Sequence, residues 1–165
     1  MYKGKNRMKR IVIIAAAALA IQGCAGGMAS KGDADYVTNA SDIVKNTDWS
    51  TMKTVVIDMN EFAYSPDDLQ FDKDQPYKLV LRNSGEKKHY FTAPEFYKAI
   101  ATRKVQSNKD GEIKAPYFTA IELMKGENKP ELEIYFVPVK VGSYPVYCTI
   151  DDHREQGMEG TLVIR

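Results

Sequence analysis

Histidine, cysteine and long apolar runs are all scarce in this chain of 165 residues. Only two histidines, His89 and His153, and two cysteines, Cys24 and Cys148, are present. So few cysteines exclude a framework of several disulfide bonds. The apolar run at residues 11–21 has eleven residues, whereas a transmembrane helix needs about 20. This run is therefore too short to be read as a membrane-spanning helix.

The first residues have the composition of an export signal. A start with five cationic residues and no acidic residue precedes the apolar run, which has the length of a secretory signal core. The run ends in Ile21-Gln22-Gly23-Cys24, which resembles a bacterial lipoprotein cleavage box. We therefore expect residues 1–23 to be a lipoprotein signal peptide and Cys24 to carry the lipid anchor. An ordinary signal peptide with an unrelated cysteine is the alternative, and it predicts export from the cytoplasm as well.

A segment rich in Gly, Ser, Asp and Asn separates this signal from the rest of the chain. We expect residues 24–50 to be a flexible tether from acylated Cys24, and residues 51–165 to form one domain. Removal of residues 1–23 takes away five positive charges and no negative charge, so the net charge changes from +1 to −4. Nucleic-acid binding needs a basic surface, so this balance excludes a nucleic-acid partner. If Cys24 carries a lipid, no internal disulfide bond can form.

Short apolar segments divided by turn residues predict an all-β sandwich. In one of them Tyr77, Leu79 and Leu81 alternate with Lys78 and Arg82, as expected for a strand with one buried face. By the same pattern, strands are expected at residues 54–59, at 62–71 with a turn in the middle, and at 77–82, 131–136, 142–148 and 160–165.

One segment breaks the β pattern. Thr92-Ala93-Pro94-Glu95 matches a capping box, in which Thr92 is the N-cap and Glu95 reaches back to it. Apolar residues follow with helical spacing. We therefore predict a short helix at residues 94–102, followed by a polar loop at residues 104–114.

The scarce histidines and Cys148 form a pattern of metal ligands. From Cys148 the spacing is C-x4-H-x4-M, which places His153 and Met158 in one short loop between two expected strands. His89 comes from a separate strand end. One thiolate, two imidazoles and one thioether are the ligand set of a blue-copper centre, and they favour copper over magnesium, calcium or manganese. We therefore predict that His89, Cys148, His153 and Met158 bind one copper ion.

The C-x4-H-x4-M motif, together with the turn at residues 62–71 and the segment at residues 83–89, resembles the cupredoxins. The ligand spacing is most similar to that of rusticyanin-like and plastocyanin-like members. The resemblance covers residues 54–165 in outline. It implies a Greek-key β-sandwich that holds one type 1 copper, cycles between Cu(I) and Cu(II), and transfers single electrons. It also implies that the ring edge of His153 is exposed and admits the electron. Asp151-Asp152 departs from the Pro-Gly of many relatives, and the helix-bearing segment is longer than in the smallest members.

The residue counts separate the functions that such a site permits. A copper oxidase or nitrite-reductase-type enzyme needs further histidines, and a binuclear terminal-oxidase centre needs two cysteines in one loop. We therefore expect no enzyme activity. An electron carrier outside the cytoplasm fits best, and a copper-binding or copper-delivery lipoprotein with the same fold is the alternative. Delivery sites must release the ion and tend to be exposed.

Three acidic residues surround one of the predicted ligands. Asp151, Asp152 and Glu155 flank His153 and are candidates for docking a redox partner, such as a c-type cytochrome or a terminal oxidase, because electrostatics set the rate of encounter. The alternative is a solvated loop without a docking role. We expect a periplasmic monomer anchored to the membrane through Cys24.

Overall fold

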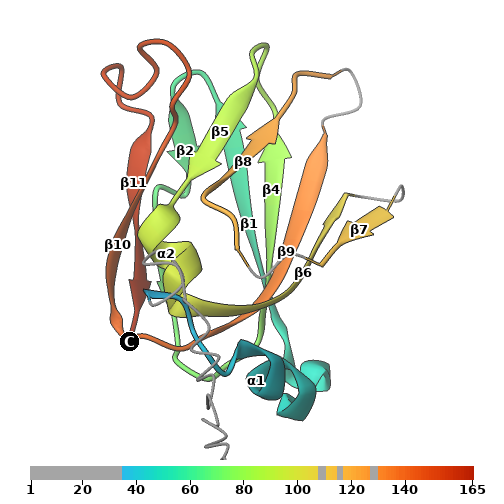
Figure 1. The fold of residues 1–165 in the computed structure, drawn as a ribbon. Helices are drawn as coiled ribbons and strands as arrows, with labels where there is room; N and C mark the ends of the chain where they lie inside the picture. The colour runs from blue at the N-terminus through green and yellow to red at the C-terminus, as the bar shows by residue number, and fades with distance from the viewer. Residues whose placement is uncertain (1–34, 108–110, 115–116, 127–129) are drawn as a thin grey trace, which may run out of the picture.

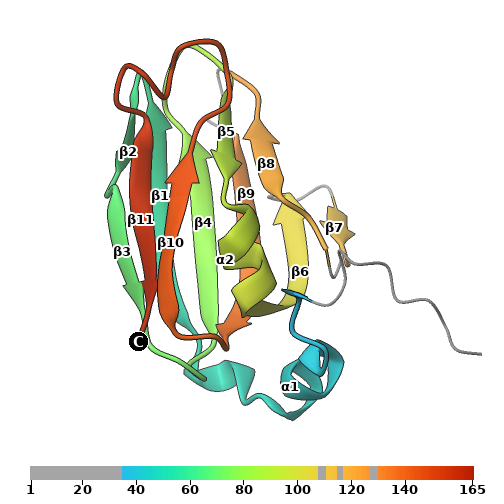
Figure 2. The same ribbon diagram turned by 60° about the vertical axis from the view of Figure 1, so that its left-hand side comes forward.

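The chain folds into two β-sheets packed face to face (Figures 1 and 2). The computed structural model describes residues 35–107, 111–114, 117–126 and 130–165. Within these residues, the first sheet has six strands in the order β2-β1-β4-β9-β6-β7. In chain order they are β1 (Lys53–Asn60), β2 (Ala63–Ser65), β4 (Tyr77–Asn83), β6 (Ile100–Ser107), β7 (Gly111–Ile113) and β9 (Glu131–Pro138).

The second sheet has five strands in the order β3-β11-β10-β5-β8 within the described residues. In chain order they are β3 (Asp68–Phe71), β5 (His89–Thr92), β8 (Ala120–Leu123), β10 (Gly142–Tyr147) and β11 (Glu159–Ile164). β1 pairs with β4 and β3 with β11 in parallel, and the other pairs are antiparallel. The predicted all-β Greek-key sandwich with a short inserted helix is confirmed.

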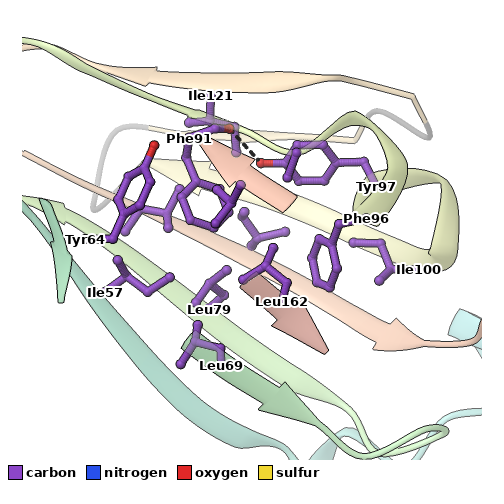
Figure 3. Close-up of a cluster of buried hydrophobic side chains, with 14 of the residues drawn as sticks. Ile57, Tyr64, Leu69, Leu79, Phe91, Phe96, Tyr97, Ile100, Ile121 and Leu162 are labelled. Carbon is purple, nitrogen blue, oxygen red and sulfur yellow. Dashed lines mark hydrogen bonds between the residues drawn. The ribbon is translucent and has the colours of Figure 1, made fainter. Parts of the chain in front are cut away.

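Apolar side chains from the inner faces of both sheets fill the space between them (Figure 3). Leu79 and Leu81 of β4 are fully buried, as their alternation with Lys78 and Arg82 predicts. Leu162 reaches the same core from the opposite sheet. Burial of each such side chain stabilises the fold by about 1.5–3 kcal/mol relative to exposure, before losses of entropy are counted.

The helix α2 (Pro94–Ala99) confirms the expected insertion but differs from it at both ends. Its N-cap is Ala93, without a side-chain cap hydrogen bond, and not Thr92. Thr92 instead ends β5, where it is paired with Ala120 of β8, so strand pairing overrides the capping box. The helix also ends before residue 102, because Ile100 begins β6 and pairs with β9.

The polar loop predicted at residues 104–114 is wrong. Most of that stretch belongs to β6 and β7, which pair as antiparallel strands, although residues 108–110 lie outside the described part. β6 lies beside β9, with Val105 buried opposite Ile134 and Lys104 over the ring of Tyr135. The polar residues of β6 lie on the outer face of the sandwich. Because they are numerous, the segment has the composition of a loop in the sequence.

Residues 35–51 are folded, whereas the sequence predicted a flexible tether up to residue 50. Helix α1 (Ala40–Asn46) and the 3-10 helix η2 (Trp49–Thr51) occupy this stretch. The ring of Trp49 donates a hydrogen bond to Val44 (3.0 Å) and lies against the guanidinium of Arg103 in β6 (4.7 Å). Val37 is buried. These few apolar residues hold the segment on the sandwich.

The signal peptide, Cys24 and the first part of the tether lie outside the described residues, so those predictions remain untested. Among the helices of the described part, none combines the length and apolarity that a membrane crossing requires.

The two loops that carry the predicted ligands lie at one end of the sandwich, and α1 lies at the other (Figures 1 and 2). The first loop joins β4 to β5 and delivers His89 as the first residue of β5. The second joins β10 to β11 and contains Cys148, His153 and Met158. The fold therefore brings together ligands that are far apart in the sequence.

Candidate metal centre

Three of the four predicted ligands form a compact buried cluster. One ligand atom each of His89, Cys148 and His153 lies within 4.8 Å of the other two. Cys148 Sγ is 3.5 Å from His153 Nδ1, and the two imidazole centroids are 5.1 Å apart. The exposed fractions of the three residues are 0%, 1% and 1%. The start of β5 and the loop between β10 and β11 thus converge on one small volume shielded from water.

The loop between β10 and β11 is held by backbone hydrogen bonds that link its predicted ligands. Cys148 N–H donates to the carbonyl of Met158 (3.0 Å), and Met158 N–H donates to the carbonyl of His153 (2.9 Å). Gly157 allows the chain to turn between them, because its φ of +105° lies in the left-handed region. The positions of His153 and Met158 relative to Cys148 are therefore fixed by the main chain.

Met158, which belongs to the same loop, is completely buried. Its backbone bonds to both Cys148 and His153, as the spacing of the motif requires. A weak axial thioether is the usual fourth ligand beside two imidazoles and a thiolate. The role of the Met158 sulfur as that ligand remains a prediction.

The loop before His89 is braced by a buried amide that the sequence analysis did not single out. Asn83 Nδ2 donates to the carbonyl of Lys87 (2.8 Å) and to the carbonyls of Leu123 (3.2 Å) and Met124 (3.1 Å). Its Oδ1 accepts the N–H of Gly85 (2.9 Å). An Asn in a polar turn gives no sign of all these contacts in the sequence, because two of its partners, Leu123 and Met124, lie 40 and 41 residues further along the chain.

The thiol of Cys148 receives a hydrogen bond from a neighbouring strand. Tyr90 N–H, one residue after His89, donates to Cys148 Sγ at 3.4 Å. A donor aimed at sulfur favours the negatively charged thiolate, which is the form that binds metals. Because the donor is a backbone group, no residue type in the sequence could have revealed it.

The turn between β1 and β2 places the side chain of Phe62 at the cluster. The ring of Phe62 lies edge-on to the ring of His153, with centroids 4.9 Å apart. Lys87 Nζ in turn lies 5.1 Å from the centroid of Phe62. His153 is only 1% exposed, so the expectation of an exposed imidazole edge is wrong for this chain. This contact has no signature in the sequence, because Phe62 is distant from His153 in the chain and belongs to a turn.

Glu61, the neighbour of Phe62, approaches the other imidazole. Its Oε1 is 3.4 Å from His89 Nε2, within ion-pair range but without the alignment of a hydrogen bond. Burial raises the pKa of the Glu61 carboxyl, but the N–H groups of Lys87, Glu61 and Glu86 and the charge of His89 outweigh it. The pKa of Glu61 is therefore lowered, and the group is ionised at neutral pH.

Burial also lowers the pKa of His89 below its usual value, and neighbouring His153 adds to this effect, while Glu61 opposes it. A neutral imidazole results at neutral pH. This is the protonation state that metal coordination requires, because a nitrogen lone pair must be free.

The polar atoms at the centre indicate that a metal ion fits there. His89 Nδ1 and Nε2 and His153 Nε2 are buried and have no hydrogen-bond partner among the described residues. Each such atom costs about 1–3 kcal/mol when left without a partner. A metal ion bound to a nitrogen lone pair and to the thiolate removes part of this cost. Two imidazoles and one thiolate suit copper, and His89, Cys148 and His153 can hold one copper ion.

The three acidic residues predicted for docking are exposed in the same loop. Asp151 has a φ of +41°, a conformation that Asp tolerates better than most residues. Arg154, between Asp152 and Glu155 in the chain, lies over the ring of Tyr147 (4.2 Å) and pairs with Glu159 (3.1 Å). The loop surface thus carries both signs of charge, and the docking role of the acids remains a prediction.

No protein-family model and no curated protein sequence matches the chain. Solved structures do match it. A multicopper oxidase from Pseudomonas thermotolerans is 17% identical over 73% of this chain and 31% of that chain, with a TM-score of 0.53. Reduced auracyanin from the photosynthetic bacterium Roseiflexus castenholzii is 17% identical over 68% of this chain and 96% of that chain, with a TM-score of 0.46.

Auracyanin A from Chloroflexus aurantiacus, described as a "blue" copper protein, is 19% identical over 69% of this chain and 99% of that chain, with a TM-score of 0.45. At such identities the similarity shows the fold alone. The chain has a cupredoxin-like fold, and it spans less than a third of the length of the oxidase. The start of β5 and the loop between β10 and β11, which carry the buried cysteine and the two histidines, lie at one end of that fold.

Proposed function

We propose that the protein is a one-electron carrier with a single type 1 copper ion, held by His89, Cys148 and His153, with Met158 as a weak axial ligand. The observation that carries this proposal is the burial of the thiol and both imidazoles within 4.8 Å of one another. The copper would supply the Cu(I)/Cu(II) couple. The residues of the chain hold the ligands in place and keep water away from them.

The rigidity of the ligands favours electron transfer. The main chain fixes the Cys148–Met158 loop, and the buried amide of Asn83 fixes the approach to His89. A ligand set that cannot rearrange keeps the structural change small when the charge of the ion changes. Because imidazole and thiolate ligands suit both oxidation states, one fixed arrangement serves both.

Copper delivery is the second candidate, and the burial of the cluster argues against it. A delivery protein hands its ion to a partner by exchange of ligands, which requires access to the site. Here each of the three candidate ligands is at most 1% exposed. The site is better suited to retaining an ion than to passing it on.

An oxidase or reductase with several copper centres is less consistent with this chain. Such an enzyme needs histidines beyond those of one mononuclear site, and both histidines of the chain belong to the cluster described above. The similarity to a multicopper oxidase extends over 31% of that protein, so it concerns one domain-sized part of it. We therefore propose that the protein itself is not an enzyme.

We further propose that the protein works outside the cytoplasm, anchored by a lipid on Cys24, as a monomer that exchanges electrons with a protein such as a c-type cytochrome or a terminal oxidase. The support is the cationic start, the eleven-residue apolar run and the Ile21-Gln22-Gly23-Cys24 sequence. A lipid-anchored carrier can reach membrane-bound and soluble partners on the same side of the membrane.

The visible spectrum of the copper-loaded, full-length chain tests the metal assignment. A copper–thiolate bond should give an intense visible charge-transfer band, and voltammetry should show one reversible one-electron wave. The two cysteines provide matched variants: Cys148→Ser should abolish the band, whereas Cys24→Ser should keep it and release the protein from membranes. Zinc as the only bound metal, with no redox wave, would overturn the electron-transfer proposal. Unchanged membrane binding of Cys24→Ser would overturn the anchor.

A further inference from the structure

The carboxylate of Glu61, in the turn between β1 and β2, lies beside the imidazole of His89. Glu61 Oε1 is 3.4 Å from His89 Nε2, and the imidazole is completely buried. Both ring nitrogens of His89 are buried without a hydrogen-bond partner among the described residues. An ionised acceptor beside one of them decides which nitrogen carries the proton.

The position of Glu61 is built into the loop that precedes His89. Its Oε1 accepts the backbone N–H groups of Glu86 (2.8 Å) and Lys87 (2.7 Å). Gly85 allows the close approach, because a Cβ at that position would lie 2.6 Å from Oε1. The carboxylate is thus clamped by the residues two and three positions before His89, and its distance to the imidazole follows from the fold.

A fixed carboxylate at Nε2 has a chemical consequence for the other nitrogen. A neutral imidazole carries one proton, and an ionised acceptor at Nε2 favours that proton on Nε2. The lone pair is then on Nδ1, which is available to a metal. Partial withdrawal of the proton by the carboxylate also makes the imidazole a stronger electron donor, which favours Cu(II) over Cu(I).

We infer that Glu61 is a positioning residue of the copper site: its carboxylate, 3.4 Å from His89 Nε2, attracts the imidazole proton to that nitrogen, so that the tautomer presents Nδ1 to the metal, and it lowers the reduction potential. This inference rests on the proposed function. It goes beyond that function because Glu61, which is not a ligand, would control both the tautomer of His89 and the reduction potential.

A purely structural role for Glu61 makes a different prediction. If Glu61 only clamps the loop, a glutamine should replace it well, because the amide oxygen can accept the same two backbone N–H groups. Glutamine has the same shape but no charge, so it separates the two roles. Glu86, an exposed residue of the same loop, provides the control: Glu86→Gln removes the same charge nearby and changes no contact with His89.

The decisive experiment measures the reduction potential and the His89 tautomer of the full-length chain. We expect Glu61→Gln to shift the Cu(I)/Cu(II) ratio at a fixed electrode potential about tenfold towards Cu(I), which corresponds to about 59 mV for one electron. Glu86→Gln should shift it much less. Equal shifts in both variants would mean that any nearby negative charge has this effect, and would overturn the specific role of Glu61. No shift in Glu61→Gln would overturn it as well.

Nitrogen-15 NMR of the wild-type Cu(I) protein gives a second, independent reading. We expect the proton of His89 on Nε2, and a proton on Nδ1 would overturn the inference even if Glu61→Gln failed to fold. If the wild-type chain binds zinc and no copper, the proposed function fails. The tautomer of His89 in the zinc-loaded protein then decides the role of Glu61 by itself.

Discussion

The ring of Phe62 lies edge-on against the ring of His153, with centroids 4.9 Å apart and planes inclined by 67°. This contact closes the side of the cluster on which an exposed imidazole was expected. Phe62 itself is partly exposed. The imidazole of His153 is therefore buried, and an apolar ring in contact with it contributes to this burial.

Replacement of Phe62 by alanine should open the site to water. Water stabilises the more highly charged Cu(II) state, so we expect Phe62→Ala to lower the reduction potential. Loss of a partly buried ring should also destabilise the fold by about 1–3 kcal/mol, less than for a fully buried phenylalanine. Voltammetry and urea unfolding of the copper-loaded chain measure the two effects.

Phe62→Leu is the control for that change, because it keeps an apolar cover without an aromatic ring. Its potential should stay near that of the wild type. A fall in potential as large as in Phe62→Ala would mean that the ring acts through its aromatic contact with His153 and not by excluding water.

The sequence predicted the strands with clear alternation and the Cys148–Met158 loop, because both depend on local patterns. Tyr77, Leu79 and Leu81 alternate with polar residues, and the structure buries all three. Thr92 misled the helix prediction because a capping box is local, whereas the pairing of Thr92 with Ala120 joins residues far apart in the chain.

The surroundings of the cluster could not be predicted for a related reason. Glu61 and Phe62 belong to a turn with ordinary composition. The pairing of β1 with β4 brings Glu61 near His89, and Phe62 reaches His153 in a loop of the other sheet. The thiol contact of Tyr90 is made by the main chain, which every residue except proline possesses. Side chains and backbone groups brought together by tertiary packing carry no local signature.

Met158 should control the potential without being needed for folding or for copper binding. We expect Met158→Leu to retain one copper and to raise the reduction potential, because removal of a weak donor destabilises Cu(II) more than Cu(I). Leucine has a similar volume, so the stability cost should stay below about 1.5 kcal/mol. Metal analysis, voltammetry and urea unfolding test these expectations together. An unchanged potential would show that the Met158 sulfur does not contact the ion.

The lowered pKa of His89 predicts how the stability of the metal-free chain depends on pH. Unfolded His89 titrates near its ordinary pKa of about 6.5, and the folded pKa is lower because of burial. Between these two values the unfolded state binds more protons, so stability is fully present above about pH 6.5 and is lost as pH falls through the folded pKa.

Urea unfolding between about pH 7 and pH 5 measures this dependence. In the His89→Gln variant the decline should be smaller over the same range, because one titrating group is absent while the carboxyl groups remain. An identical decline in both proteins would show that His89 is not the group responsible. Copper should weaken the dependence in the wild type, because the ion competes with the proton for the imidazole.

The acidic pair Asp151 and Asp152 of the ligand loop should have little influence on the reduction potential. Asp151 and Asp152 are exposed beside His153, and negative charge near the copper favours Cu(II). Exposed charges act through a high effective dielectric, so Asp151→Asn with Asp152→Asn should raise the potential only slightly. Asparagine tolerates the positive φ of Asp151, so the loop should keep its conformation.

A larger effect of this double change is expected on association with a basic cytochrome. Electron transfer should slow at low salt and approach the wild-type rate at high salt, because screening acts over about 8–10 Å at ordinary ionic strength. Asp42→Asn with Asp74→Asn removes one charge from α1 and one from the turn between β3 and β4, at the end of the sandwich away from the ligand loops. This variant should change the rate little, which separates docking from net charge. Stopped-flow rates over a series of salt concentrations make the comparison. If the loop variant reacts as fast as the wild type at every ionic strength, the acidic pair is not the docking surface, and the partly exposed ring of Phe62 with neighbouring Lys87 becomes the place to test next.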